Sequence, residues 1–103
     1  MMPSQMAKEQ ETQHNSFHAI IKGRVQRVGY RVFTREAALR HSVKGWVKNL
    51  PNGCVEVLAE GEEINLTEFL TELYRGPVLS HVQDIDLNWQ HVEPQHDEFA
   101  ILR

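Results

Sequence analysis

A loop that carries two glycines and is followed by an arginine is the part of this sequence best suited to bind an anion. Gly23 and Gly29 enclose a stretch without regular periodicity, and a helical pattern begins at about Tyr30. Such a loop can turn backbone N–H groups inward, and the helix that follows adds the partial positive charge of its N-terminus. Arg31 would lie in the first helical turn, where its guanidinium can donate two hydrogen bonds to a tetrahedral oxyanion. The pattern indicates a phosphate site, although glycine loops before helices also occur in proteins without one.

Asn49 is the second candidate for chemistry, near the end of a predicted strand over residues 43–50. A neutral amide both accepts and donates hydrogen bonds, so it can hold a water molecule beside a bound phosphate. Orienting that water in line with a bond to phosphorus can accelerate the reaction by several orders of magnitude. The alternative is that Asn49 caps the turn at residues 51–53, and the local sequence by itself favours this alternative.

Length and composition restrict the class of protein. The chain has 103 residues, 41% of them hydrophobic, and a formal net charge of −3, which is typical of one globular domain. No run approaches the roughly 20 apolar residues that span a bilayer, and the polar N-terminus lacks the apolar segment of a secretory signal. The single cysteine, Cys54, excludes an internal disulfide. We therefore expect a cytoplasmic protein without a membrane partner.

The charges are unevenly distributed along the chain. Residues 22–48 contain eight Lys or Arg and one acid, whereas residues 56–103 contain eleven acids and two arginines. The basic block includes Arg31 and ends one residue before Asn49, so it could draw an anionic substrate towards them. A solvated basic helix face is the alternative.

Hydrophobic periodicity predicts the elements that position these residues. Strands are expected over residues 17–22, 43–50, 54–60 and 82–92, with a short edge strand over 99–102; helices are expected from residue 30 to about 41 and from about 62 to 75. This β-α-β-β-α-β order predicts an α/β fold of the ferredoxin-like type, an antiparallel sheet with both helices on one face. Residues 1–16 are predicted to be a disordered tail before a single domain over 17–103. The predicted inward helix residues are Tyr30, Val32, Phe33, Ala37, Leu39, Ile64, Phe69 and Leu73.

Two motifs carry a resemblance to a known family. The stretch IKGRVQRVGYR, residues 21–31, resembles the phosphate-loop signature of the acylphosphatases, a G-x-V-Q-x-V-x-aromatic-R pattern. The stretch GWVKNLPNGCV, residues 45–55, with Gly61 after it, resembles the second signature of that family. Two signatures in the same order and spacing are more specific than either alone, and the resemblance extends over about residues 17–102.

The resemblance implies a small enzyme without cofactor or metal that hydrolyses acyl phosphates to a carboxylate and inorganic phosphate. It implies that Arg31 binds the phosphate and that Asn49 positions the attacking water. It also implies that backbone N–H groups of the loop wrap the phosphate, and the residues concerned are Gln26, Arg27, Val28, Gly29, Tyr30 and Arg31. The only partners expected are the small acyl phosphate and its product, for a chain that acts as a monomer.

Two positions depart from the family pattern. Arg27 stands where the family usually has Gly and less often His, and Tyr30 stands where Phe or Met is usual. If position 27 needs a positive φ, a side chain there costs about 1 kcal/mol or more; alternatively, Arg27 adds a second cation beside the site. Tyr30 needs a partner for its hydroxyl if it is buried. A phosphate-binding module of the same fold without activity is therefore the alternative function.

Other functions of this topology fit the sequence less well. RNA recognition would need exposed aromatic side chains on the central strands, and the strand at residues 55–60 has none. A metal carrier would need a pair of cysteines after the first strand, and the scattered histidines lack the spacing of metal ligands. The acylphosphatase-like domains of hydrogenase-maturation proteins belong to larger chains with zinc-finger cysteines, which favours a free-standing enzyme here. We expect no nucleic-acid partner.

Overall fold

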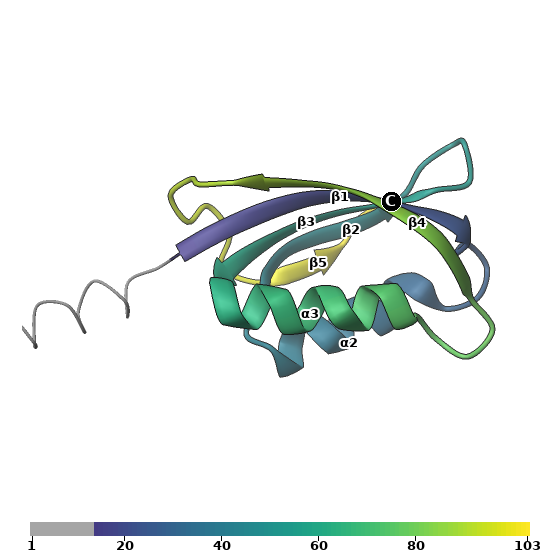
Figure 1. Cartoon of the computed structure of the whole chain (residues 1–103), viewed down its shortest axis with the longest axis horizontal. Coiled ribbons are helices and arrows are strands. Elements are labelled where there is room, and N and C mark those ends of the chain that lie inside the picture. The colour runs from purple at the N-terminus through teal and green to yellow at the C-terminus, as the bar shows by residue number, and fades with distance from the viewer. Residues whose placement is uncertain (1–13) are drawn as a thin grey trace, which may run out of the picture.

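The computed structural model describes residues 14–103, and its strands and helices follow the predicted order (Figure 1). The elements are β1 (His14–Arg24), α2 (Tyr30–Arg40), β2 (Lys44–Asn49), β3 (Val55–Glu62), α3 (Glu63–Arg75), β4 (His81–Gln90) and β5 (Phe99–Ile101). β1 therefore begins at His14, earlier than the predicted Phe17. The rest of the predicted tail, residues 1–13, lies outside the described residues.

The five strands form one sheet in the order β4-β1-β3-β2-β5, and both helices lie on one face of it (Figure 1). β1 pairs antiparallel with β3 and β4, and β2 pairs antiparallel with β3. This confirms the ferredoxin-like fold. The prediction of an antiparallel sheet was wrong at one edge, because β5 runs parallel to β2. The chain leaves β4 at one edge of the sheet and returns through residues 91–98 to the opposite edge, where it enters in the same direction as β2.

The core lies between the sheet and the helices. Three helix residues that were predicted to face inward do not belong to it. Val32, Leu39 and Ile64 are 54%, 59% and 63% exposed. The buried helix residues are Tyr30, Thr34, Ala37, Ala38, Leu66, Phe69 and Leu73. The buried residues of α2 form a narrow stripe at positions i, i+4, i+7 and i+8, counted from Tyr30. The small side chains of this stripe allow the helix to pack close to the sheet. The Thr34 hydroxyl is satisfied because it donates to the Tyr30 carbonyl, 2.8 Å away.

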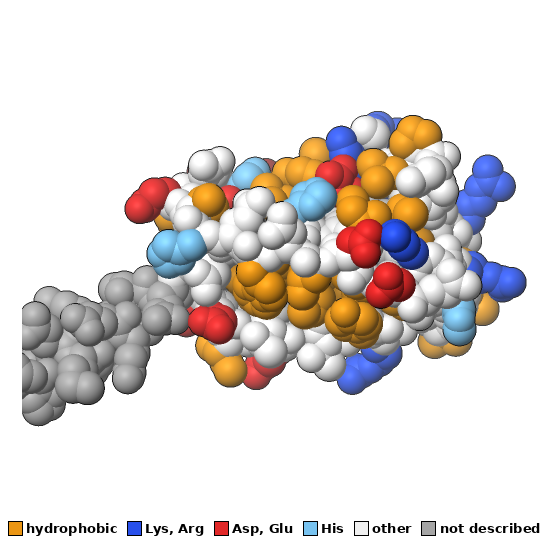
Figure 2. Space-filling model, turned by 45° about the horizontal axis from the view of Figure 1, so that its top comes forward, with side chains coloured by type: hydrophobic (Ala, Val, Ile, Leu, Met, Phe, Trp, Pro, Cys, Tyr) orange, Lys and Arg blue, Asp and Glu red, His pale blue; other side chains and the backbone are white. Residues whose placement is uncertain are grey.

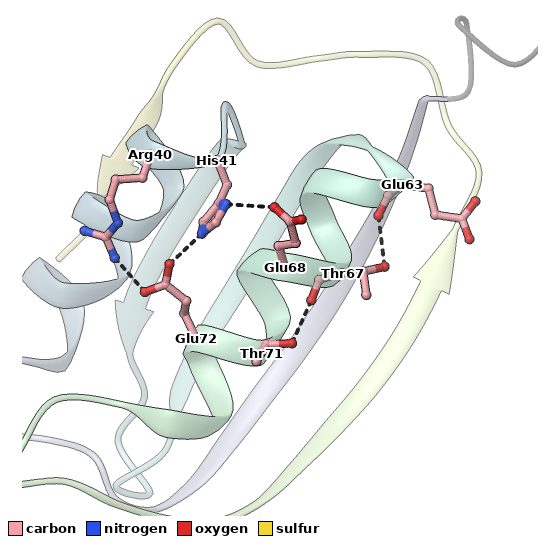
Figure 3. Close-up of polar contacts among 7 residues, drawn as sticks. All are labelled: Arg40, His41, Glu63, Thr67, Glu68, Thr71 and Glu72. Atoms are coloured by element: carbon pink, nitrogen blue, oxygen red, sulfur yellow. Dashed lines mark hydrogen bonds and ion pairs between the residues drawn. The ribbon is translucent and has the colours of Figure 1, made fainter.

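The end of α2 is tied to α3 by charged side chains (Figure 3). An Arg40 guanidinium nitrogen lies 2.6 Å from Oε1 of Glu72, whose Oε2 bonds the His41 ring. The other His41 ring nitrogen lies 3.5 Å from Glu68. Burial by itself would raise the pKa of the Glu72 carboxyl, but the hydrogen bonds from His41 and Arg40 outweigh it, so the pKa is lowered.

Glu60 is an acidic residue that the fold buries. Its carboxylate is buried at 2% exposure on β3. Oε1 accepts hydrogen bonds from the backbone N–H groups of Gln95 and His96 at 3.0 and 3.1 Å, and Oε2 lies 2.9 Å from the His96 ring. Burial by itself would raise the pKa of Glu60, but these hydrogen bonds lower it on balance. Glu60 thus anchors the connection that leads into β5.

Candidate phosphate site

The loop between β1 and α2 has the backbone geometry of an anion-binding turn. Val25 fixes the start of the loop in the core at 1% exposure. Arg27 and Gly29 are left-handed, with φ of 65° and 79°, and Val28 between them is not. Alternating backbone conformations of this kind turn successive N–H groups towards one side. A Cβ at Gly29 would meet no atom within 4 Å, so the space beside the loop is open.

The first turn of α2 adds further free donors to this loop. Gly29 is the N-cap residue, no side chain caps the helix, and the first turn has no acidic residue. The N–H groups of this turn have no partner within the helix, and the helix dipole favours an anion beside them. The loop and the helix start are therefore suited to an anion.

Gln26 ties this loop to the β2–β3 turn, a role that the sequence did not reveal. Its side-chain amide donates to the carbonyls of Leu50 and Cys54, both at 2.8 Å. The predicted role of Gln26 was to bind phosphate through its backbone, which remains a prediction. No local signal could identify the side-chain bonds, because both acceptors are backbone groups in a distant turn. The bond to Leu50 holds the loop beside the residue that follows Asn49.

Asn49 ends β2 at the same end of the sheet as this loop. Its Oδ1 is buried and has no hydrogen-bond partner among the described residues. Asn52, not Asn49, caps the turn, because its Oδ1 accepts a hydrogen bond from the Cys54 N–H at 3.1 Å. Buried amide oxygens are nearly always hydrogen-bonded in proteins. An acceptor left without a protein partner beside the loop is consistent with the predicted water-positioning role.

Tyr30 lies in the core at 1% exposure, and only its backbone can face an anion. Its hydroxyl donates a hydrogen bond to the Leu73 carbonyl in α3, 2.7 Å away. This is the partner that a tyrosine needs where the family usually has Phe or Met. Burial raises the pKa of the Tyr30 phenol, so it stays neutral and takes no part in proton transfer near neutral pH.

Arg27 of the loop and Arg31 of the first turn of α2 differ in exposure. Arg27 is exposed and Arg31 is half-buried; neither takes part in the ion pairs found within residues 14–103. In the view of Figure 2, most Lys and Arg side chains lie in the right-hand half of the molecule. Figure 1 shows that the β1–α2 loop lies in the same half. The basic block of the sequence therefore includes unpaired cations at the site.

Two other classes of site have no counterpart in the described part of the chain. It contains no group of three or more His, Cys, Asp or Glu residues that could hold a metal ion. No helix within it is long and apolar enough to cross a membrane. Cys54 is a half-buried free thiol.

Together these elements define a ferredoxin-like α+β domain whose first loop is suited to an anion. The acylphosphatase family model matches residues 17–101. An acylphosphatase of Thermus thermophilus is 46% identical, in an alignment that covers 69% of this chain and 81% of that protein. An acylphosphatase of Clostridium beijerinckii is 42% identical, and the alignment covers 82% of this chain and 94% of that protein. The crystal structure of acylphosphatase from Bacillus subtilis superposes with a TM-score of 0.84 at 37% identity, over 86% of this chain and 99% of that one. The chain belongs to the acylphosphatase family, whose activity is the hydrolysis of acyl phosphates.

Proposed function

We propose that this protein hydrolyses acyl phosphates at the β1–α2 loop, with Arg31 holding the phosphoryl group and Asn49 orienting the attacking water. The observation that carries this assignment is the buried Oδ1 of Asn49, which has no partner among the described residues. Asn49 lies next to Leu50, and the Leu50 carbonyl is bonded to Gln26 of the loop. The water-holding group and the phosphate loop are thereby linked in one unit.

The phosphoryl group is bound by backbone donors and one guanidinium. An acyl phosphate carries about two negative charges, and its transition state spreads charge over three equatorial oxygens. The N–H groups of residues 26–31 and the fork of Arg31 are fixed donors for these oxygens, which need no rearrangement during the reaction. Arg31 is paired with no acid within residues 14–103, so its charge is available to the substrate.

The reaction needs neither a general acid nor a covalent intermediate. The oxygen of the water held by Asn49 attacks phosphorus, and the bond between phosphorus and the acyl oxygen breaks. The electron pair leaves with the carboxylate, and the water proton passes to phosphate or solvent. The leaving group resembles the side chain of Asp or Glu, with a pKa near 4, so it departs unprotonated at neutral pH. We therefore propose catalysis without a cofactor or metal ion.

The remaining assignments concern the setting of the enzyme. We propose a cytoplasmic monomer whose partners are the small substrate and inorganic phosphate, without nucleic acid or membrane. The composition supports this, with a net charge of −3 and one cysteine. Phe17 of β1 is buried at 0% exposure, and β3 has no aromatic residue. Neither of these central strands therefore offers an exposed Phe, Tyr or Trp for base stacking.

Hydrolysis of benzoyl phosphate in the presence of EDTA tests the proposal. We expect turnover by the wild type, loss of nearly all turnover and of phosphate inhibition in Arg31→Ala, and a lower kcat in Asn49→Ala with phosphate inhibition intact. If the Asn49 variant no longer binds phosphate, its water-positioning role is wrong. A folded wild type, checked by circular dichroism, that binds phosphate without turnover would establish the inactive binding module instead.

A further inference from the structure

A pocket of about 320 Å³ opens beside Arg31, and the proposed reaction leaves it without a role. Its lining residues are Arg31 and Val32 of α2, Ile101 of β5, and Arg103. The volume falls within the range of sites for small ligands. The pocket is thus lined both by the arginine proposed to hold the phosphoryl group and by the end of the described chain.

Strand pairing explains why Arg103 reaches the site. β5 runs parallel to β2, with Val47 opposite Ile101, and the Leu102 N–H donates to the Val47 carbonyl at 2.8 Å. The chain therefore continues beside β2 in the direction of Asn49. Figure 1 places this terminus at the same end of the sheet as the β1–α2 loop and the β2–β3 turn.

The pocket combines apolar walls with a second cation. Val32 is 54% exposed and Ile101 is 36% exposed, although both are apolar. Arg103 is exposed and takes part in none of the ion pairs within residues 14–103. A phosphoryl group on Arg31 would direct the rest of the substrate into this space. Methylene groups could then contact Val32 and Ile101, while Arg103 lies where a more distant anionic group of the substrate would be attracted.

We propose that this pocket is the acyl-group subsite and that Arg103 selects acyl phosphates whose acyl chain ends in a second carboxylate. The inference rests on the proposed function, because it assumes that Arg31 holds the phosphoryl group. The ligand class is a monophosphorylated dicarboxylic acid, which carries one negative group at each end of an apolar chain. In this proposal Arg31 binds the phosphoryl end of the ligand and Arg103 attracts its carboxylate end. Val32 and Ile101 contact the apolar chain between the two ends.

A matched pair of substrates tests the selectivity: adipoyl monophosphate and hexanoyl phosphate, which have the same chain length and differ in the terminal carboxylate. The measured quantity is the ratio of their kcat/KM values at low ionic strength, where exposed charges are least screened. Because Arg103 is exposed, we expect Arg103→Gln to lower the ratio by about three- to fivefold. Arg103→Glu should lower it further. Arg75→Gln is the matched control, since it removes the same charge from an exposed position at the end of α3 and should leave the ratio unchanged.

The apolar walls have a separate test. Val32→Ser should raise KM for both long-chain substrates by about threefold, with a smaller effect on acetyl phosphate, which has no chain to contact the wall. An equal effect on acetyl phosphate would overturn the assignment of Val32 to the acyl chain.

The outcomes distinguish failure of the subsite from failure of the proposed function. An unchanged ratio in Arg103→Gln, or an equal fall in Arg75→Gln, would refute the role of Arg103 while hydrolysis continues. Equal loss of both substrates in Arg103→Gln would place Arg103 on the phosphoryl group and overturn the acyl assignment. If the folded wild type hydrolyses neither substrate nor benzoyl phosphate, the proposed function fails, and the subsite fails with it.

Discussion

Replacing Arg27 by glycine should make the protein more stable, although Arg27 lies in the phosphate loop. Its backbone is left-handed, with φ of 65°, and its exposed side chain forms none of the side-chain hydrogen bonds or ion pairs found within residues 14–103. The protein thus keeps a strained residue without a visible contact that offsets the strain.

The size of the effect follows from two opposing contributions. A left-handed conformation costs a residue with a Cβ about 1–2 kcal/mol. Glycine avoids this cost but has more conformational freedom to lose on folding, about 0.4–1 kcal/mol. The net gain in unfolding free energy is therefore about 0.5–1 kcal/mol, or an increase in Tm of about 2–8 °C for a domain of this size.

Thermal and urea unfolding measure the gain, and two further variants separate its causes. Arg27→Ala removes the cation but keeps a Cβ, so it should not be stabilising. Ser42→Gly is the matched control, because Ser42 is exposed, has φ of 56° and lies in the connection between α2 and β2. It should stabilise to a similar extent without changing phosphate inhibition. Arg27→Gly should retain turnover, with weaker phosphate binding if the second cation contributes to the site.

The reasoning would be refuted if Arg27→Gly lowered Tm while Ser42→Gly raised it, because the Arg27 side chain would then stabilise the fold by more than its strain. A collapse of turnover in a folded Arg27→Gly would instead make Arg27 a catalytic residue and the assignment of the site incomplete.

Three further predictions concern Tyr30 and Gln26 beside the site, and Glu60 at the other end of β3. Tyr30→Phe removes the hydrogen bond to the Leu73 carbonyl, which lies near the end of α3. We expect urea unfolding to show that the unfolding free energy falls by about 1 kcal/mol, while hydrolysis is retained. An unchanged unfolding free energy would contradict a stabilising role of this hydrogen bond. Gln26→Ala removes the two hydrogen bonds that hold the β2–β3 turn beside the loop. It should lower kcat more than it lowers the affinity for phosphate. A selective loss of phosphate inhibition would count against a role of Gln26 in positioning this turn. The hydrogen bonds from Gln95 and His96 hold the pKa of Glu60 below its ordinary value in the folded state. The unfolded chain therefore binds more protons, and stability falls as the pH drops through the acid range towards the folded pKa. Glu60→Gln should show a shallower decline in acid titrations, and a decline as steep as that of the wild type would exclude this contribution.

Local sequence patterns predicted the elements well because their signals are local. Glycine and the change of period mark the start of α2 at Tyr30, and Gly76 with the proline after it marks the end of α3 at Arg75. The inward faces were predicted less well. Val32, Leu39 and Ile64 are apolar at plausible helical positions, yet the sheet contacts a different stripe. Amphipathicity limits the orientation of a helix, and packing against its partner fixes it.

By itself, the sequence determined the order of the elements, the basic block, and Arg31 and Asn49 as candidates, because composition and spacing along the chain carry this information. The tertiary structure alone decided which residues from distant segments come together. The Gln26 amide bonds the β2–β3 turn, the Glu60 carboxylate bonds the segment before β5, and Arg103 and Arg31 line one pocket. It also decided the left-handed backbone of Arg27. These contacts depend on strand order and register, and above all on β5 returning parallel to β2. A pairing between residues far apart in the chain leaves no periodic signal in either segment, so it emerges only when the sheet is assembled.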